Sequence, residues 1–139
     1  MRQQLVLRVD PSSAEPVYEQ LVGAVRRAVA TGRLAPGDRL PSVRELAREL
    51  VINPNTIAKA YQALESEGIT VSRHGSGTFV ADGRALMRRP EQKRRLREGI
   101  DALLTDAVHL GLTQDDVRAE FDDAMQRFRF RGGAGEGTK

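Results

Sequence analysis

The chain lacks cysteine and tryptophan, and only 4% of its 139 residues are aromatic. Without cysteine, disulfide cross-links and thiolate metal sites are excluded. No run of residues approaches the roughly 18 consecutive apolar residues that a bilayer-spanning helix needs. Residues 1–5 also lack the long apolar run of a signal peptide. We therefore expect a cytoplasmic protein with no membrane partner.

The net charge is also small. The chain has 22 Lys and Arg residues and 19 Asp and Glu residues, which gives a net charge of +3. Both signs are spread along the chain, so this balance does not by itself indicate a nucleic-acid ligand. Arginine greatly outnumbers lysine, which suits contacts to phosphate and guanine. The base composition of a genome produces the same bias, so the function has to be inferred from local arrangement.

The first 40 residues predict one short strand and one helix. Residues 5–9 form an apolar, strand-like run, closed by the turn-prone residues 10–13. Pro16 suits the first turn of a helix, where its missing N–H costs nothing. Apolar residues recur at helical spacing from Val17 to Val29. Gly32 is well placed to end this helix.

Residues 40–68 predict two short, capped helices. Ser42 and Glu45 have the spacing of a capping box, in which each side chain accepts from the other residue's amide. A second helix is expected from Pro54 to about Glu67, with Asn53 as its N-cap. A turn of about three residues joins the two, which is the arrangement of a helix-turn-helix. The expected inward-facing residues are Val43, Leu46, Ala47, Leu50, Ile57, Ala60, Tyr61 and Leu64.

A β-hairpin is expected directly after these helices. Residues 69–73 and 78–80 are β-prone and flank a glycine-containing tip at residues 74–77. A hairpin in this position is a wing. The sequence therefore predicts an α+β fold, mainly α, with a winged helix-turn-helix domain in residues 1–83.

The remaining residues differ in character. A basic run from Arg88 to Arg97 opens a helix, Gly111 interrupts the chain, and Thr113 with Asp115 and Asp116 predicts a capped restart. Residues 84–131 are thus expected to be a two-helix region, and the glycine-rich residues 132–139 a disordered tail. An apolar stripe follows both helices, comprising Leu96, Ile100, Leu103, Leu104, Val108, Val117, Phe121 and Met125.

This stripe predicts dimerisation. Two isolated helices cannot bury so many apolar side chains, and an exposed patch of this size normally marks an interface. Packing against the same patch of a second chain buries it with two-fold symmetry, so we expect a homodimer. The basic run Arg88–Arg97 has two interpretations, either contact with flanking DNA phosphates or a solvated helix face.

In order and spacing, these segments resemble the GntR family of transcriptional regulators. The residues that carry the resemblance span roughly positions 5 to 81 and comprise residues 16–21, Gly32 with Leu34, residues 36–47, residues 53–56, Ala60-Tyr61, Leu64-Glu65, Glu67-Gly68 and the wing residues 75–80. The two-helix tail is similar in length and pattern to the YtrA branch of the family. Members of that branch dimerise through the tail and repress operons, often ones that encode transporters. The resemblance thus implies a DNA-binding domain followed by a dimerisation tail.

In a helix-turn-helix, the N-terminal residues of the second helix meet base edges in the major groove. This places Asn53, Asn55, Thr56 and Lys59 toward DNA, where asparagine can pair with adenine and a threonine methyl can contact thymine. Asn53 has a second interpretation as a helix cap only, and Lys59 as a solvated charge. Ala58 stands where some relatives carry arginine, so one base contact of the family is missing.

The remaining candidate DNA contacts lie outside the second helix. The resemblance assigns the counterpart of Arg44 a base or phosphate contact, for which a guanidinium fork is suited. Ser42 is expected to add a phosphate contact beside its capping role. At the wing tip, His74, Gly75 and Ser76 are expected to approach the minor groove.

The predicted function is a sequence-specific transcriptional regulator, a repressor that binds double-stranded DNA at an inverted-repeat operator as a homodimer. An enzyme is the first alternative, but no paired carboxylates or phosphate-binding loop are recognisable, and His74 and His109 lie far apart in sequence. We therefore expect no catalytic residues, metal or cofactor. A second alternative is a protein-interaction module. A small-molecule effector at the dimer interface that alters the spacing of the DNA-binding domains is a further hypothesis.

Overall fold

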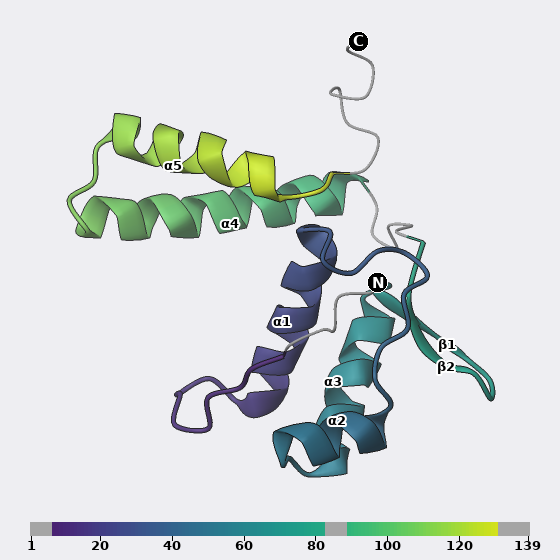
Figure 1. Cartoon of the computed structure of the whole chain (residues 1–139). Coiled ribbons are helices and arrows are strands. Elements are labelled where there is room, and N and C mark those ends of the chain that lie inside the picture. The colour runs from purple at the N-terminus through teal and green to yellow at the C-terminus, as the bar shows by residue number, and fades with distance from the viewer. Residues whose placement is uncertain (1–6, 83–88, 131–139) are drawn as a thin grey trace. The chain divides into compact units, whose positions relative to one another are not determined.

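The computed structural model describes residues 7–82 and 89–130, which belong to two compact units (Figure 1). The first unit contains helices α1 (Val17–Ala30), α2 (Val43–Leu50) and α3 (Pro54–Ser66), followed by strands β1 (Thr70–Arg73) and β2 (Gly77–Val80). The second contains α4 (Arg89–His109) and α5 (Gln114–Arg127). The order of helices and hairpin is the one that the sequence predicts.

Helix α3 is the centre of the first unit, because it packs against α1, α2 and β1. Burying each aliphatic side chain of such a core contributes about 1.5–3 kcal/mol. The buried hydrophobic residues are Leu7, Leu21, Val25, Ala28, Leu34, Leu40, Leu46, Ala47, Ile57, Ala60, Tyr61, Leu64 and Val80. Nearly every element contributes to this core, so the position of α3 is fixed from several sides.

The caps of α2 and α3 agree with the sequence in part. The Ser42 hydroxyl oxygen accepts from the Glu45 backbone amide at 3.0 Å, and the Asn53 side-chain oxygen Oδ1 accepts from the Asn55 backbone amide at 2.9 Å. The reciprocal half of the predicted capping box is wrong, because the Glu45 carboxylate accepts no hydrogen bond from the Ser42 amide. Glu45 is exposed, so its carboxylate is satisfied by water at little cost.

The turn between α2 and α3 depends on an unusual backbone conformation at Val51. This residue lies in the left-handed region, with φ 55° and ψ 52°, and its side chain is 89% exposed. The amides of Val51 and Ile52 both donate to the Ala47 carbonyl, which closes the C-terminus of α2. A β-branched residue is strained in this conformation because its Cβ approaches the following carbonyl oxygen.

Tyr61 links α3 to the segment before α2. Its ring is buried, and its hydroxyl donates to the Pro41 carbonyl over 2.6 Å. Burial, together with the nearby Glu45 carboxylate, raises the pKa of Tyr61 well above its usual value. The prediction of Tyr61 as a core residue is confirmed.

The hairpin is antiparallel, and it pairs Thr70 with Val80 and Arg73 with Gly77. The free edge of β2 pairs with the segment before α2. There Leu40 N donates to Thr78 O at 2.8 Å and Val80 N donates to Asp38 O at 2.8 Å. These bonds attach the wing to the helix-turn-helix.

The strand predicted for residues 5–9 is wrong over its described part, since residues 7–9 form no strand. Leu7 is buried in the core, which explains why this position is apolar although residues 7–9 do not pair in a β-sheet. The one edge of β2 that β1 leaves free is occupied by residues 38–40, so no partner remains there for an additional strand. Leu5, Val6 and the predicted tail 132–139 lie outside the described residues.

The two-helix unit has well-formed helix ends but little core. Thr113 caps α5 through a reciprocal box with Asp116, and Gly111 takes a φ of +77° in the turn. The predicted restart at Thr113 is therefore confirmed. Among the described side chains of this unit, Ala107 alone is buried.

Replacing Val51 with glycine is expected to stabilise the protein. Relief of the left-handed strain, about 1–2 kcal/mol, exceeds the entropy cost of a glycine, about 0.5–1 kcal/mol. The exposed valine side chain gives up little burial. We expect Val51→Gly to raise the free energy of unfolding in urea. Val51→Ala retains the Cβ and serves as the control that should show no comparable gain. A less stable Val51→Gly variant would contradict this account.

Candidate nucleic-acid interface

The N-terminal end of α3 presents polar side chains to solvent. Asn53 and Asn55 are exposed, Thr56 is half-buried and Lys59 is exposed, whereas Ile57 on the opposite side of the helix is fully buried. The Asn53 carbonyl oxygen is engaged as the helix cap, so its amide nitrogen is the group left for another partner. Asn55 and Thr56 have no such capping duty and remain available to base edges.

Two residues around the start of α2 are placed for contact with an anion. Arg44, in the first turn of α2, is exposed. The Ser42 hydroxyl oxygen accepts from Glu45, which leaves the hydroxyl hydrogen free to donate to a phosphate. The short helix α2 lies across the end of the unit at which α3 begins, so these groups and the N-terminus of α3 are at the same end (Figure 1).

Lys59 is held by a residue that the sequence analysis did not single out for a functional role. Its Nζ atom lies over the Tyr18 ring, 4.2 Å from the ring centroid. Tyr18 is half-buried in the first turn of α1, a helix that packs on α3. Such a cation–π contact is worth about 0.5–1 kcal/mol at an exposed site. It fixes the ammonium group near the N-terminal half of α3. The residues lie 41 positions apart, so no local spacing could have shown this pair.

The wing tip is open. His74, Gly75 and Ser76 are all exposed, and Ser76 N donates to Arg73 O at 2.9 Å to close the turn. Gly75 has a φ of +76° and no atom within 4 Å of the place where a Cβ would stand. Its backbone is therefore accessible to a narrow groove.

The residues that the structure describes contain no group of three or more His, Asp or Glu side chains placed to hold a metal ion. No helix among them is both long and apolar enough to cross a membrane.

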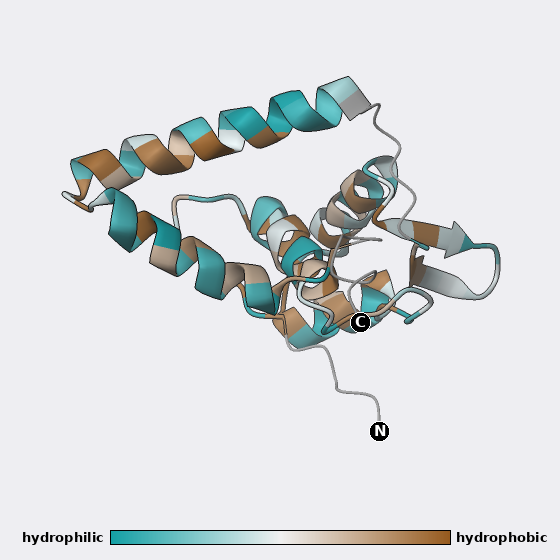
Figure 2. Cartoon of the chain, turned by 90° about the horizontal axis from the view of Figure 1, so that it is seen from above, coloured by the Kyte–Doolittle hydropathy of each residue, from teal (hydrophilic) through white to brown (hydrophobic). Residues whose placement is uncertain are grey.

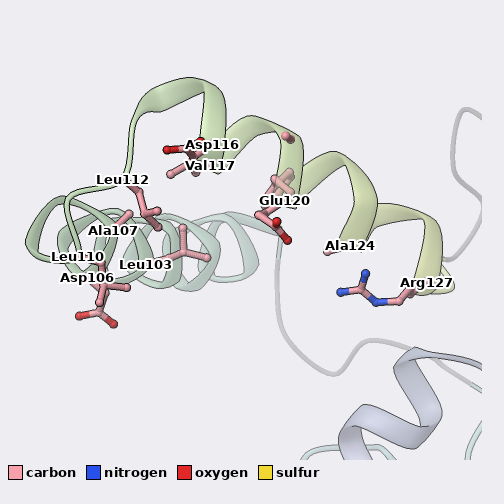
Figure 3. A pocket seen from close by; sticks show the side chains of 12 residues that line it. Leu103, Asp106, Ala107, Leu110, Leu112, Asp116, Val117, Glu120, Ala124 and Arg127 are labelled. Atoms are coloured by element: carbon pink, nitrogen blue, oxygen red, sulfur yellow. The ribbon is translucent and has the colours of Figure 1, made fainter.

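The second unit carries the other candidate surface. A groove of about 740 Å³ runs between α4 and α5, and its walls are mainly apolar (Figure 3). The figure shows Leu103, Leu112 and Val117 near the turn end of this groove, with Glu120 and Arg127 farther along α5. In Figure 2 the first turns of α4 are mostly hydrophilic, and the hydrophobic bands gather toward α5.

The apolar stripe predicted on this unit is largely exposed. Leu96 is 62%, Val108 73% and Phe121 47% exposed, and α5 has no buried residue. Ile100, Leu103, Leu104 and Met125 are also exposed, and Val117 is half-buried. The stripe is therefore available to a partner.

In the basic run, Arg94 forms ion pairs with Glu91 and Glu98 on its own helix. These ion pairs favour the interpretation of Arg94 as part of a solvated helix face. Lys93, Arg95 and Arg97 are exposed. Arg88 lies outside the described residues.

Comparison with known proteins identifies the family. Residues 17–80 match the model of bacterial regulatory proteins of the gntR family. The HTH-type transcriptional repressor YtrA of Bacillus subtilis (strain 168) is 36% identical over 107 residues, which cover 77% of this chain and 82% of that protein. The chain belongs to the GntR family.

Solved structures agree with this assignment. A transcriptional antiterminator from Listeria monocytogenes EGD-e superposes on this GntR chain with a TM-score of 0.73 and 30% identity, covering 86% of this chain and 90% of the other. YtrA from Sulfolobus acidocaldarius, a GntR-family transcription factor, gives a TM-score of 0.57 and 33% identity over 71% of this chain and 97% of the other. The resemblance to the YtrA branch and the winged-helix fold are thereby confirmed.

Family membership also fixes the broad function. GntR proteins are transcriptional regulators, so this chain is a DNA-binding regulator rather than an enzyme. The five helices and the two-stranded wing in residues 7–82 and 89–130 are the α+β, mainly α fold that the sequence predicts. The individual DNA-contacting residues and the dimer stay predictions.

The Tyr18–Lys59 contact leads to a test by double mutation. We expect Lys59→Ala to weaken DNA binding and to lower the steepness of its dependence on log salt by about 0.9 for each protomer bound, the value for one phosphate. Tyr18→Leu should weaken binding less, and Tyr18→Phe, which keeps the ring, should bind like the wild type. In the Lys59→Ala background, Tyr18→Leu should have no further effect, as fluorescence anisotropy would show. Additive effects would mean that Tyr18 acts independently of Lys59.

Proposed function

We propose that this GntR protein is a repressor that binds an inverted-repeat operator as a homodimer in the cytoplasm. The observation that carries the proposal is the pairing of two features. One is an N-terminal end of α3 whose polar side chains are free of core duties. The other is a two-helix unit whose apolar stripe has no core of its own.

The proposed reading surface has three parts. Asn55 and Thr56 meet base edges from α3, while Arg44 binds guanine or phosphate from α2. Lys59, over Tyr18, neutralises a phosphate. The Ser42 hydroxyl donates to a DNA phosphate. The side-chain amide nitrogen of Asn53 contacts the DNA while its side-chain oxygen caps α3.

The wing completes this surface. Gly75 permits close approach to the minor groove because nothing stands where its side chain would be. His74 and Ser76 flank it and supply donors to the sugar-phosphate edges.

Dimerisation is proposed through residues 84–131. Helices this short gain most of their stability from packing of an apolar face, and α5 packs none of its side chains fully within its own chain. A second copy supplies an identical stripe, and the closed two-fold arrangement buries both. Two α3 helices related by a two-fold axis read the two halves of an inverted repeat.

The assignment as a repressor is supported by the relative that is named for this activity, the B. subtilis repressor YtrA, most of whose length this chain covers. A dimer clamped on an operator competes with other proteins for the same DNA, which is the simplest way for a small regulator without an enzymatic activity to act.

We propose that a small-molecule effector binds at the dimer interface, in the groove between α4 and α5, whose walls include Leu103, Val117 and Phe121 of the apolar stripe. The volume of this groove, about 740 Å³, and its apolar walls suit a mainly apolar molecule of drug-like size. Binding there alters how two tails pack, and hence the fraction of dimers whose DNA-binding domains are correctly spaced.

Selection of bound sequences from random duplex DNA tests the DNA-binding proposal. At physiological salt we expect enrichment of one inverted repeat by the wild-type chain. Thr56→Ala and Arg44→Ala should fold normally but bind each half of the selected duplex roughly five- to 150-fold more weakly, since a good base contact is worth about 1–3 kcal/mol. Arg26→Ala is the matched control, because Arg26 lies on α1 and pairs with Glu67 at the C-terminal end of α3, away from the proposed reading surface. Enrichment of a single half-site, or of nothing, would contradict the proposal.

A charge placed in the apolar stripe tests the dimer. We expect Ile100→Glu and Phe121→Glu to sediment as monomers at micromolar concentration, because an unpaired carboxylate is costly to bury. Ala102→Glu, which introduces the same charge on the side of α4 that helical spacing turns away from the stripe, should remain dimeric. A wild-type chain that sediments as a monomer would overturn the proposal directly.

A further inference from the structure

The wing has an outward face that its role in the core does not explain. Side chains alternate between the two faces of a hairpin, and Thr70 and Val80, which are paired, are both buried against the first unit. Their neighbours along the strands therefore point the other way. Arg73 and Phe79 lie on this outward face, together with Gly77.

Arg39 adds a second cation to the same face. It forms a β-bridge with Phe79, which places the two side chains on the same side of the sheet. Its Nε donates to Ser76 O over 3.4 Å. A Cβ at Gly77, where φ is +118°, would stand only 3.0 Å from this Nε atom. The missing side chain of Gly77 thus gives Arg39 the space to lie along the wing.

Arg73 is fixed from the other strand. Its guanidinium carbon lies over the Phe79 ring, 4.9 Å from the centroid. A guanidinium stacked on an aromatic face keeps its N–H groups at its edges free to bind. Phe79 is therefore flanked by two arginines, one bridged to it from the segment before α2 and one stacked on it from β1.

Both arginines are exposed, and neither belongs to any ion pair among residues 7–82. The carboxylate of Glu65, from α3, accepts instead from the Ser72 amide at 2.7 Å. Two ordered cations without a carboxylate partner form a site for an anion with several acceptor oxygens. A phosphate fits a guanidinium fork in this way.

We propose that this outward face of the wing, formed by Arg39, Arg73 and Phe79, binds backbone phosphates of the DNA that flanks the base pairs read by α3. The inference rests on the proposed DNA-binding surface, because Arg73 directly precedes the wing tip that approaches the duplex. Phe79 is a positioning residue that holds Arg73, while Arg39 and Arg73 make the contacts.

Salt dependence of binding by the full chain tests this assignment, with a duplex recovered in the selection extended by flanking base pairs. Each lost phosphate contact lowers the magnitude of the log–log slope by about 0.9. Because both protomers of the proposed dimer lose the contact, we expect Arg39→Gln and Arg73→Gln each to lower it by about 1.8, and the double variant by about twice as much. Arg39→Lys, which keeps the charge, should retain the slope. Arg26→Gln removes a cation of α1 that pairs with Glu67 at the C-terminal end of α3, and it should leave the slope unchanged.

Phe79 supplies a second readout. Phe79→Leu keeps every charge but removes the ring, so it should weaken binding, whereas Phe79→Tyr should not. In the Arg73→Gln background, Phe79→Leu should add no further loss. Thermal melting by circular dichroism identifies any variant that loses its fold. In that case the comparison uses the conservative variants Arg39→Lys and Phe79→Tyr.

The outcomes separate the two proposals. A wild-type chain that binds no duplex overturns the proposed function itself. A wild-type chain that binds its selected duplex, loses affinity on Thr56→Ala and keeps its full salt slope in the Arg39→Gln, Arg73→Gln double variant overturns the wing-face site alone. Loss of dimerisation in that double variant, with an unchanged slope, would assign the face to protein contact and would equally overturn the inference.

Discussion

The burial of α3 is the constraint on which the rest of the first unit depends. One side of this 13-residue helix supplies Ile57, Ala60 and Leu64 to the core, and it packs against α1, α2 and β1. The other side is left polar and open. A helix held from three directions cannot turn about its own axis, so the residues offered to DNA are determined by which residues are buried. The same packing carries Tyr18 to Lys59 and joins the wing to the segment before α2.

The second unit obeys the opposite rule, since its helices have regular caps and hardly any interior. Thr113 and Asp116 specify where α5 begins, yet no side chain of α5 is buried. Local signals are therefore enough to form the helices, whereas their stability has to come from contacts outside the pair. This division of labour suits a regulator in which the first unit reads DNA and the second unit joins two chains.

Sequence reasoning succeeded where the signal is local and failed where it depends on distant partners. The caps at Ser42 and Asn53, the helical period of α3 and the glycine-containing tip predicted the helix-turn-helix and the wing within a residue or two. The apolar run at residues 5–9 was misread because burial of Leu7 resembles a strand pattern. Arg39, Phe79 and Tyr18 were missed because bridges and ring contacts join residues far apart in the chain. The residue type at position 51 does not predict a left-handed backbone, since valine is among the residues least suited to that conformation.

The short hydrogen bond from Tyr61 to the Pro41 carbonyl has a consequence for how specificity arises. It joins α3 to the segment just before α2, so Arg44 on α2 and Thr56 on α3 keep a constant separation. Within the first unit, the surface proposed to read DNA is therefore preformed, and little ordering of its own groups opposes binding. A rigid surface of this kind leaves adjustment of the fit to the duplex, through bending or a change of groove width. Sequences that deform easily are favoured at positions that no side chain touches.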